Sequence, residues 1–442
     1  MLAMLLAGCS ATLPETPAVR PTPAAWSASA TPLASTAADE WWRAFGDPAL
    51  DELVASVPQS DDVAIAEARL DAAAARLRVA RAALRPELGA SARGSIQRID
   101  DLELRQGTGV LSLAWSPDLN GAGRTRRRAA GARLEEEGAR TAAVRQATRA
   151  TVVRLYVTWR EGLARAEAER RAVEALSGTE RLVASRRRAG LVSGVDPVAA
   201  EATRASAAAR RPAAIEAAET ARLALEALLG RAPGALQRAA SATVPAASPR
   251  DILLAPLDVL ARRPDVLAAE RALAATGFEA AAARRDFWPT ITLGAAVGGQ
   301  VSDPEFPGAF TGALGQLTGG LLAPLLSFGR LEAARDGADA ARREAAIRYR
   351  QTATRAVSEV ETALTAAREA DVRRVTLAEA LAANRRRAAL SMSRYRAGLS
   401  PLLDVLVARE GEARAEADLA TAQADTARAY IALSVAMGLG SA

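Results

Sequence analysis

Few residue types in this chain could carry out chemistry. Its 442 residues include no histidine and a single cysteine, Cys9. Histidine acid–base catalysis, the usual zinc ligand sets, iron–sulfur ligation and internal disulfides are therefore excluded. Carboxylate, hydroxyl and arginine chemistry remains, since every basic residue is an arginine. No nucleophile constellation accompanies these groups, and the Gly-rich LTGGL segment lacks the lysine of a phosphate-binding loop, so an enzyme is the least favoured interpretation.

Two short segments place charged residues in the same pattern. RRRAGL at 186–191 and RYRAGL at 394–399 are each followed by an aspartate, Asp196 or Asp404. In each segment a glycine stands where a helix would end in a left-handed cap, and a proline follows soon after. Each segment is therefore expected to form the tip of a helical hairpin. The expected tip residues are Arg188, Gly190, Leu191, Arg396, Gly398 and Leu399.

The cysteine belongs to an N-terminal apolar run that ends in LAGC at 6–9. This run resembles the lipobox of bacterial lipoproteins, whose cysteine is lipidated and becomes the new N-terminus. Residues 1–8 are thus expected to be a signal remnant and Cys9 to carry a covalent lipid, with no other cofactor. No positive segment precedes the run, which departs from a signal peptide, and an ordinary Ala/Leu start is the alternative.

Residues 9–40, which include Cys9, are rich in Pro, Ala, Thr and Ser, a composition expected of an extended tether. The rest of the chain has no run of eighteen apolar residues, so any membrane crossing must use strands. The net charge of +6 could serve nucleic acid or an anionic surface. The arginines are interleaved with acidic residues, as in ARLEEEGAR, which favours solvated helix faces and no nucleic-acid partner.

The chain contains two copies of one plan. DVAIAEARL at 62–70 matches DVLAAERAL at 265–273, and the tip segments match in the same order. We expect a first repeat at 41–235, a linker at 236–250 and a second repeat at 251–442. Each repeat should hold a helix, a β-hairpin, a long helix, a tip and a return helix. The β-hairpins are expected at 87–118 and 290–323, and the tips at 186–196 and 394–404.

Apolar and polar residues alternate in ELGASARGSIQ at 87–97 and TITLGAAVGGQV at 290–301, with aromatic residues near the ends of the strands. This pattern is typical of transmembrane barrel strands with a lipid face and a wet lumen, although a soluble sandwich would alternate in the same way. Four strands cannot close a barrel, because the smallest bacterial barrels have eight. If these strands span a membrane, several chains must share one barrel.

Long proline-free segments follow the hairpins, at 118–196 and 325–400. A helix of about 65 residues would be about 100 Å long, more than a compact domain needs. Five apolar residues in the second segment have the a/d spacing of a coiled coil, so the long helices are expected to pack closely on one another. These residues are Ala353, Val357, Val360, Leu364 and Ala367.

The chain resembles the outer membrane factor family of Gram-negative bacteria, in particular its lipoprotein branch of NodT/OprM-like, TolC-type channels. The motifs that carry the resemblance are LAGC, WWRAFGDPALDEL at 41–53, RPDVLAAE at 263–270, FWPTITL at 287–293 and the two RAGL tips. The resemblance implies a mainly α fold with a transmembrane β segment. It further implies a homotrimer whose chains together form a 12-stranded β-barrel and a 12-helix α-barrel.

The resemblance also implies a function and partners. The protein would be a passive gated duct in the outer membrane, lipid-anchored, with a long periplasmic extension. Its tips would meet a periplasmic adaptor protein and, through it, an inner-membrane pump that exports drugs or other small molecules. The alternatives are the outer channel of a type I protein secretion system and, from another class, a periplasmic coiled-coil scaffold without a channel.

In the family an aspartate soon after the tip glycine lines the closed aperture, and Asp404 matches it, with Asp196 as its equivalent in the first repeat. A second family aspartate is Val407 here, and a basic partner is Ser400. These two departures from the family pattern disfavour a salt-bridged gate, and a single carboxylate repeated in three chains could form a ring that attracts cations instead. The alternative is that each aspartate is simply the N-cap of its return helix.

Overall fold

A computed structural model describes residues 26, 38–99, 102–236, 242–247, 256–302 and 312–440 of the chain. The predicted lipid-attachment residue Cys9 and the signal remnant 1–8 lie outside the described residues, as do most of the tether 9–40 and much of the linker 236–250. The described part is mainly helical with one antiparallel sheet, which confirms the predicted fold class.

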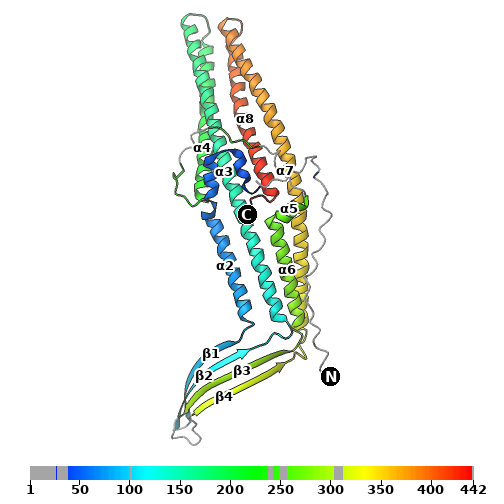
Figure 1. Ribbon diagram of the computed structural model, residues 1–442. Coiled ribbons are helices and arrows are strands. Elements are labelled where there is room, and N and C mark those ends of the chain that lie inside the picture. Colours follow the sequence, from blue (N-terminus) through cyan, green and yellow to red (C-terminus); the bar gives the residue numbers. More distant parts are fainter. Residues whose placement is uncertain are drawn as a thin grey trace. The chain divides into compact units, whose positions relative to one another are not determined.

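Both halves of the chain run through the predicted order of helix, β-hairpin, long helix and return helix (Figure 1). Each long helix has 67 residues, close to the expected length. In the first half the elements are α2 (Asp61–Ala82), β1 (Glu87–Ile99), β2 (Leu102–Trp115), α3 (Ala122–Arg188) and α4 (Val195–Leu228). In the second half they are α6 (Pro264–Arg285), β3 (Thr290–Ser302), β4 (Gly312–Leu322), α7 (Arg330–Arg396) and α8 (Leu402–Ala436). Short elements precede each half, namely η1 (Ala38–Phe45), α1 (Pro48–Ala55), η2 (Val57–Gln59) and α5 (Pro256–Arg262).

The chain forms two compact units. Among the described residues, the first contains 68–139 and 267–352 and holds the sheet. The second contains 26, 38–67, 140–266 and 353–440 and holds both hairpin tips. Each unit draws on both halves of the sequence. The two compact units therefore do not coincide with the two sequence repeats.

The four strands form one antiparallel sheet in the order β1-β2-β3-β4. Each predicted hairpin is present, and β2 also pairs with β3, so the two halves of the chain share the sheet. Directly paired residues in such a ladder lie on the same face. Leu113 of β2 faces Leu88 of β1 and Ala295 of β3, and Ala295 in turn faces Leu317 of β4.

The register therefore gathers the alternating residues into one apolar and one polar face. Apolar residues on the first face include Leu88, Ile96, Leu111, Leu113, Leu293, Val297, Val301, Leu317 and Leu321. These side chains are exposed to solvent in the single chain, and for the residues described no helix of this unit lies across either face (Figure 1). None of the helices in the described part of the chain combines the length and the hydrophobicity of a membrane-spanning segment.

The second unit is built from two antiparallel helical hairpins, α3 with α4 and α7 with α8, and the predicted coiled-coil seam of α7 is found there. Val360, Leu364 and Ala367 are buried in its hydrophobic core and Val357 packs against that core, and Ala353 is also buried. Alanine dominates the other buried positions of these helices. Small side chains allow the close approach of helix backbones that such long hairpins require.

The RPDV segment has a structural role in this unit. The guanidinium of Arg263 is nearly inaccessible and donates hydrogen bonds to Asp265 at 2.8 Å, Glu359 of α7 at 2.6 Å and the carbonyl of Ala436 at 2.9 Å. Burial of Arg263 is thus compensated by two carboxylates and by the carbonyl end of α8. The motif joins the start of α6 to both helices of the second hairpin.

Candidate functional site

The two tips are built in the same way. The amide of Gly190 donates to the carbonyl of Arg187 and that of Leu191 to the carbonyl of Arg186, and the second tip repeats both bonds one repeat later. These are the two hydrogen bonds of a Schellman motif, which needs a left-handed residue after the helix. Gly190 and Gly398 adopt φ values of 71° and 75°, so the predicted caps are confirmed.

A small apolar cluster lies beneath the tips and holds the two hairpins together. Side chains from all four long helices contribute to it. Its fully buried members include Val183 of α3, Ala200 of α4 and Val405 of α8, and Tyr395 of α7 is almost fully buried. This buried cluster therefore supports both tips and fixes the two hairpins against each other.

The ends of the two hairpins lie near each other (Figure 1), and one arginine joins the first tip to the second. Arg186, in the last turn of α3, donates to the carbonyl of Tyr395 at 2.8 Å and to that of Arg396 at 2.9 Å. Its guanidinium also lies 4.6 Å from the centre of the Tyr395 ring. A cation at the carbonyl end of α7 is favoured by the helix dipole, and the ring adds a cation–π contact.

The predicted tip residues are presented to solvent. Arg188 and Arg396 are exposed, and within the described part of the chain neither side chain makes a hydrogen bond or an ion pair. Leu191 and Leu399 are 69% and 68% exposed. The predicted arginine and leucine of each tip are thus both accessible to solvent.

Asp196 and Asp404 lie in the first turns of α4 and α8, where a carboxylate favours the helix dipole. The alternative that they are N-caps is wrong, because the N-cap positions are occupied by Gly194 and Pro401. Asp404 is exposed and Asp196 is half-buried, and neither carboxylate has an ion-pair partner among the described residues. A single chain does not bring the two aspartates into contact.

The contact between Arg186 and Tyr395 was not predicted from the sequence. The sequence does contain a signal for this contact. When RRRAGL at 186–191 is aligned with RYRAGL at 394–399, Arg187 corresponds to Tyr395, and no other aromatic residue occurs in these two segments. An aromatic residue next to a helix end is a natural place for an arginine from a neighbouring helix to stack. That neighbour could not be identified before the hairpins were placed.

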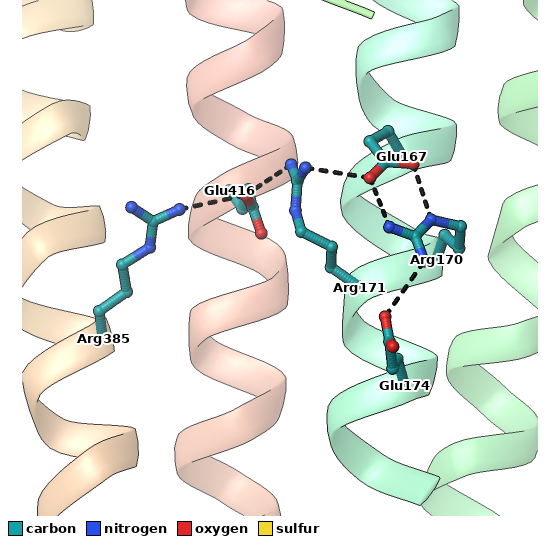
Figure 2. Close-up of polar contacts among 6 residues, drawn as sticks. All are labelled: Glu167, Arg170, Arg171, Glu174, Arg385 and Glu416. Atoms are coloured by element: carbon teal, nitrogen blue, oxygen red, sulfur yellow. Dashed lines mark hydrogen bonds and ion pairs between the residues drawn. The ribbon is translucent and has the colours of Figure 1, made fainter.

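Farther along the helices from the tips, charges connect three helices (Figure 2). Glu416 of α8 accepts from Arg171 of α3 at 2.8 Å and from Arg385 of α7 at 3.1 Å. Arg171 also contacts Glu167, and hydrogen bonds from Arg170 hold the pKa of the Glu167 carboxyl below its ordinary value. Glu416 thus bridges the first hairpin and both helices of the second.

Replacing Gly398 by valine should loosen the second tip. A Cβ at this position would meet no other atom within 4 Å, so the cost arises from the positive φ, roughly 1–2 kcal/mol. Hydrogen exchange of the amides at 394–399 should become faster. Gly398→Asn is the control, because asparagine tolerates this conformation better than valine, and equal exchange in both variants would contradict the argument.

The sequence matches the family model described as outer membrane efflux protein twice, over residues 56–231 and 255–439. It is 30% identical to the pyoverdine export outer membrane protein OpmQ of Pseudomonas putida, over 99% of this chain and 96% of that protein. It is also 30% identical to nodulation protein T of Rhizobium leguminosarum bv. viciae, over 100% of this chain and 93% of that protein.

The fold is similar to those of solved outer-membrane channels. The outer-membrane channel OprN superposes with a TM-score of 0.85 at 26% identity, covering 97% of this chain and 99% of that one. The open state of the MtrE outer membrane channel of Neisseria gonorrhoeae gives a TM-score of 0.83 at 25% identity, covering 97% and 98% of the two chains.

Proposed function

This chain belongs to the outer membrane efflux protein family, and we propose that it is the outer-membrane channel of a tripartite efflux system. In this role three chains form a passive gated duct that carries drugs or other small molecules from an adaptor and pump to the exterior. Cys9 carries the lipid anchor. The long helices extend through the periplasm, and the tips meet the adaptor.

The sheet is the observation that carries this proposal. One face is apolar and uncovered, the other is polar, and among the described strands β1 and β4 each leave one edge unpaired. Unpaired strand edges are a template for pairing with another chain. Lipid on the apolar face, water on the polar face and neighbouring chains at both edges would satisfy all three features at once.

The relatives favour a small-molecule cargo. OpmQ is named for pyoverdine export, a small-molecule activity, and the OprN and MtrE structures are described as channels. A duct of this kind leaves selection to the pump, so few of its side chains need to touch the cargo specifically. Protein secretion is the second candidate, and a strain that loses secretion of one protein but keeps its drug resistance would favour it.

Planar-bilayer conductance of the detergent-extracted protein, with its mass measured by native mass spectrometry, tests the proposal. A trimer that conducts and prefers cations is the expected result. A monomer that remains soluble without detergent and never conducts would mean that the strands form no barrel. The coiled-coil scaffold would then replace the channel.

Asp404→Ala should raise the single-channel conductance of the trimer by on the order of two-fold, because three smaller side chains widen a narrow aperture. It should also weaken the preference for cations, because the carboxylates that attract cations and repel anions are lost. The bilayer assay measures both quantities. Asp196→Ala, the equivalent change in the first repeat, is the matched comparison. Unchanged conductance and unchanged selectivity in Asp404→Ala would contradict the proposal that Asp404 carboxylates form a ring at the aperture.

Arg396→Glu should weaken docking of the adaptor while the trimer stays folded. The side chain is exposed and unpaired within the described chain, so its reversal removes no internal contact. Cross-linking to the adaptor in living cells should fall, and drug resistance should fall with it. Normal cross-linking and normal resistance would count against docking at this tip, and Arg188→Glu tests the first tip in the same way.

A further inference from the structure

We propose that Arg394 of one chain donates hydrogen bonds to the last carbonyls of α3 in the next chain, as Arg186 does to the last carbonyls of α7 within its own chain. We call such a contact, an arginine bound to the carbonyl end of a neighbouring helix, a clamp. The inference rests on the trimeric channel proposed above. It assigns a residue to the interface between two copies of this chain, and the partner is a second copy that presents its first hairpin tip.

The internal repeat makes Arg186 and Arg394 equivalent. SRRRAGL at 185–191 aligns with SRYRAGL at 393–399, and each of the two arginines stands four residues before its tip glycine. Both helices end in the same pair of backbone hydrogen bonds. The two arginines thus leave their helices from the same position relative to the same cap.

Among the described residues, one of the two equivalent arginines has hydrogen-bond partners and the other has none. Arg186 reaches the carbonyls of Tyr395 and Arg396, at 2.8 and 2.9 Å. Arg394 is exposed, and the described residues offer it neither a hydrogen bond nor an ion pair. The chain therefore contains one complete clamp and the donor of a second.

The acceptors of the second clamp are also present, at the end of α3. The residues equivalent to Tyr395 and Arg396 are Arg187 and Arg188. The side chain of Arg187 turns back to its own tip and donates to the carbonyl of Gly194 at 3.3 Å, so it does not cover its own helix end. The carbonyls there can accept from a cation, as those of α7 do.

A closed ring brings the donor and the acceptors together. When identical chains associate head to tail, contacts within chains alternate with contacts between chains around the ring. The second hairpin of one chain then lies beside the first hairpin of the next. If hairpins of adjacent chains pack on each other in the same orientation as the two hairpins within one chain, Arg394 faces the carbonyls of Arg187 and Arg188 in the adjacent chain.

The two clamps differ in one respect. Within the chain, Arg186 stacks on Tyr395 at 4.6 Å, whereas Arg394 would meet a position occupied by Arg187, which offers no ring. The clamp between chains therefore consists of hydrogen bonds to carbonyls alone. It is the weaker of the two and should be the first to break when the tips separate.

Cross-linking between two differently tagged copies tests the geometry. One full-length copy carries Arg394→Cys and the other Arg188→Cys, and the two are co-expressed and treated in membranes with a short bismaleimide. The matched control pairs Arg186→Cys on one copy with Arg396→Cys on the other, since these positions meet within a chain. Each single variant alone and the unaltered chain, which keeps Cys9, correct for background.

We expect a covalent dimer of the two tags from the Arg394→Cys and Arg188→Cys pair and none from the control pair. A native trimer without this product would overturn the clamp and leave the proposed channel intact. Equal product from both pairs would also overturn it, because the hairpins would then follow the opposite order. Absence of any trimer would overturn the channel and the clamp together.

Hydrogen exchange tests the energetic role without cysteines. Arg394→Ala should speed amide exchange at the first tip, residues 186–191, by roughly three-fold, because the first tip of the neighbouring chain loses the net free energy of one hydrogen bond. Arg186→Ala should instead speed exchange at the second tip. Acceleration confined to the tip that carries the substitution would overturn the clamp, and Arg394→Lys should restore part of the protection.

Discussion

Replacing Leu317 by arginine should prevent stable insertion of the trimer into the outer membrane. Leu317 lies in the middle of β4 on the apolar face and is 86% exposed in the single chain. An arginine on the lipid face of a barrel costs roughly 2–4 kcal/mol at the midplane, and a trimer carries the cost once per chain. The measurement is the amount of trimer recovered from outer-membrane fractions, together with its unfolding free energy in lipid vesicles.

Gln316→Arg is the matched control for this prediction. Gln316 is the adjacent residue of the same strand, is also exposed and pairs with Ala296 on the polar face. An arginine there would face the watery lumen, where substitutions alter selectivity more than stability. Equal loss of trimer in both variants would mean that the apolar face does not meet lipid. Normal insertion of Leu317→Arg would mean the same.

Replacing Gly162 by alanine should destabilise the helical unit. Gly162 is buried in α3, and a Cβ there would lie 2.8 Å from both the Cα and the backbone nitrogen of Ala218 in α4. Backbone atoms of a packed helix cannot move aside as a flexible side chain can, so α3 and α4 must separate. Overpacking of this kind costs about 1–3 kcal/mol and should lower the thermal unfolding temperature of the purified trimer.

Gly178→Ala makes the identical change sixteen positions farther along the same helix and should have the opposite effect. Its Cβ would meet only the end of the flexible Arg181 side chain, at 3.9 Å. Alanine is favoured over glycine in a helix by about 1 kcal/mol, so this variant should be slightly stabilised. A rise in unfolding temperature for both variants would show that α3 and α4 are not closely packed at Gly162.

The hairpins and their tips were predicted because they depend on local sequence. Proline-free, alanine-rich segments indicated the long helices, and a glycine followed by a proline indicated each tip. The strict alternation in 87–97 indicated which side chains share a face. All three features are found in the structure.

Other features of the fold and the site were not predictable in this way. Pairing of β2 with β3 joins the two repeats in one sheet, and no pattern within either strand specifies that partner. The aspartates were assigned possible N-cap roles, but the turns of the two tips place Gly194 and Pro401 at those positions. Helix ends depend on the conformation of only one or two residues, which composition does not fix.

By itself the sequence determined the duplicated plan, the approximate lengths of the long helices and the faces of the strands, because repeated motifs, proline-free segments and strict alternation can each be recognised along the chain. The tertiary structure decided which groups meet across elements. Arg186 and Tyr395 are 209 positions apart, and Glu416 accepts from helices of both hairpins. Such contacts depend on how long helices pack side by side, and that packing is set by many buried side chains together rather than by any one segment.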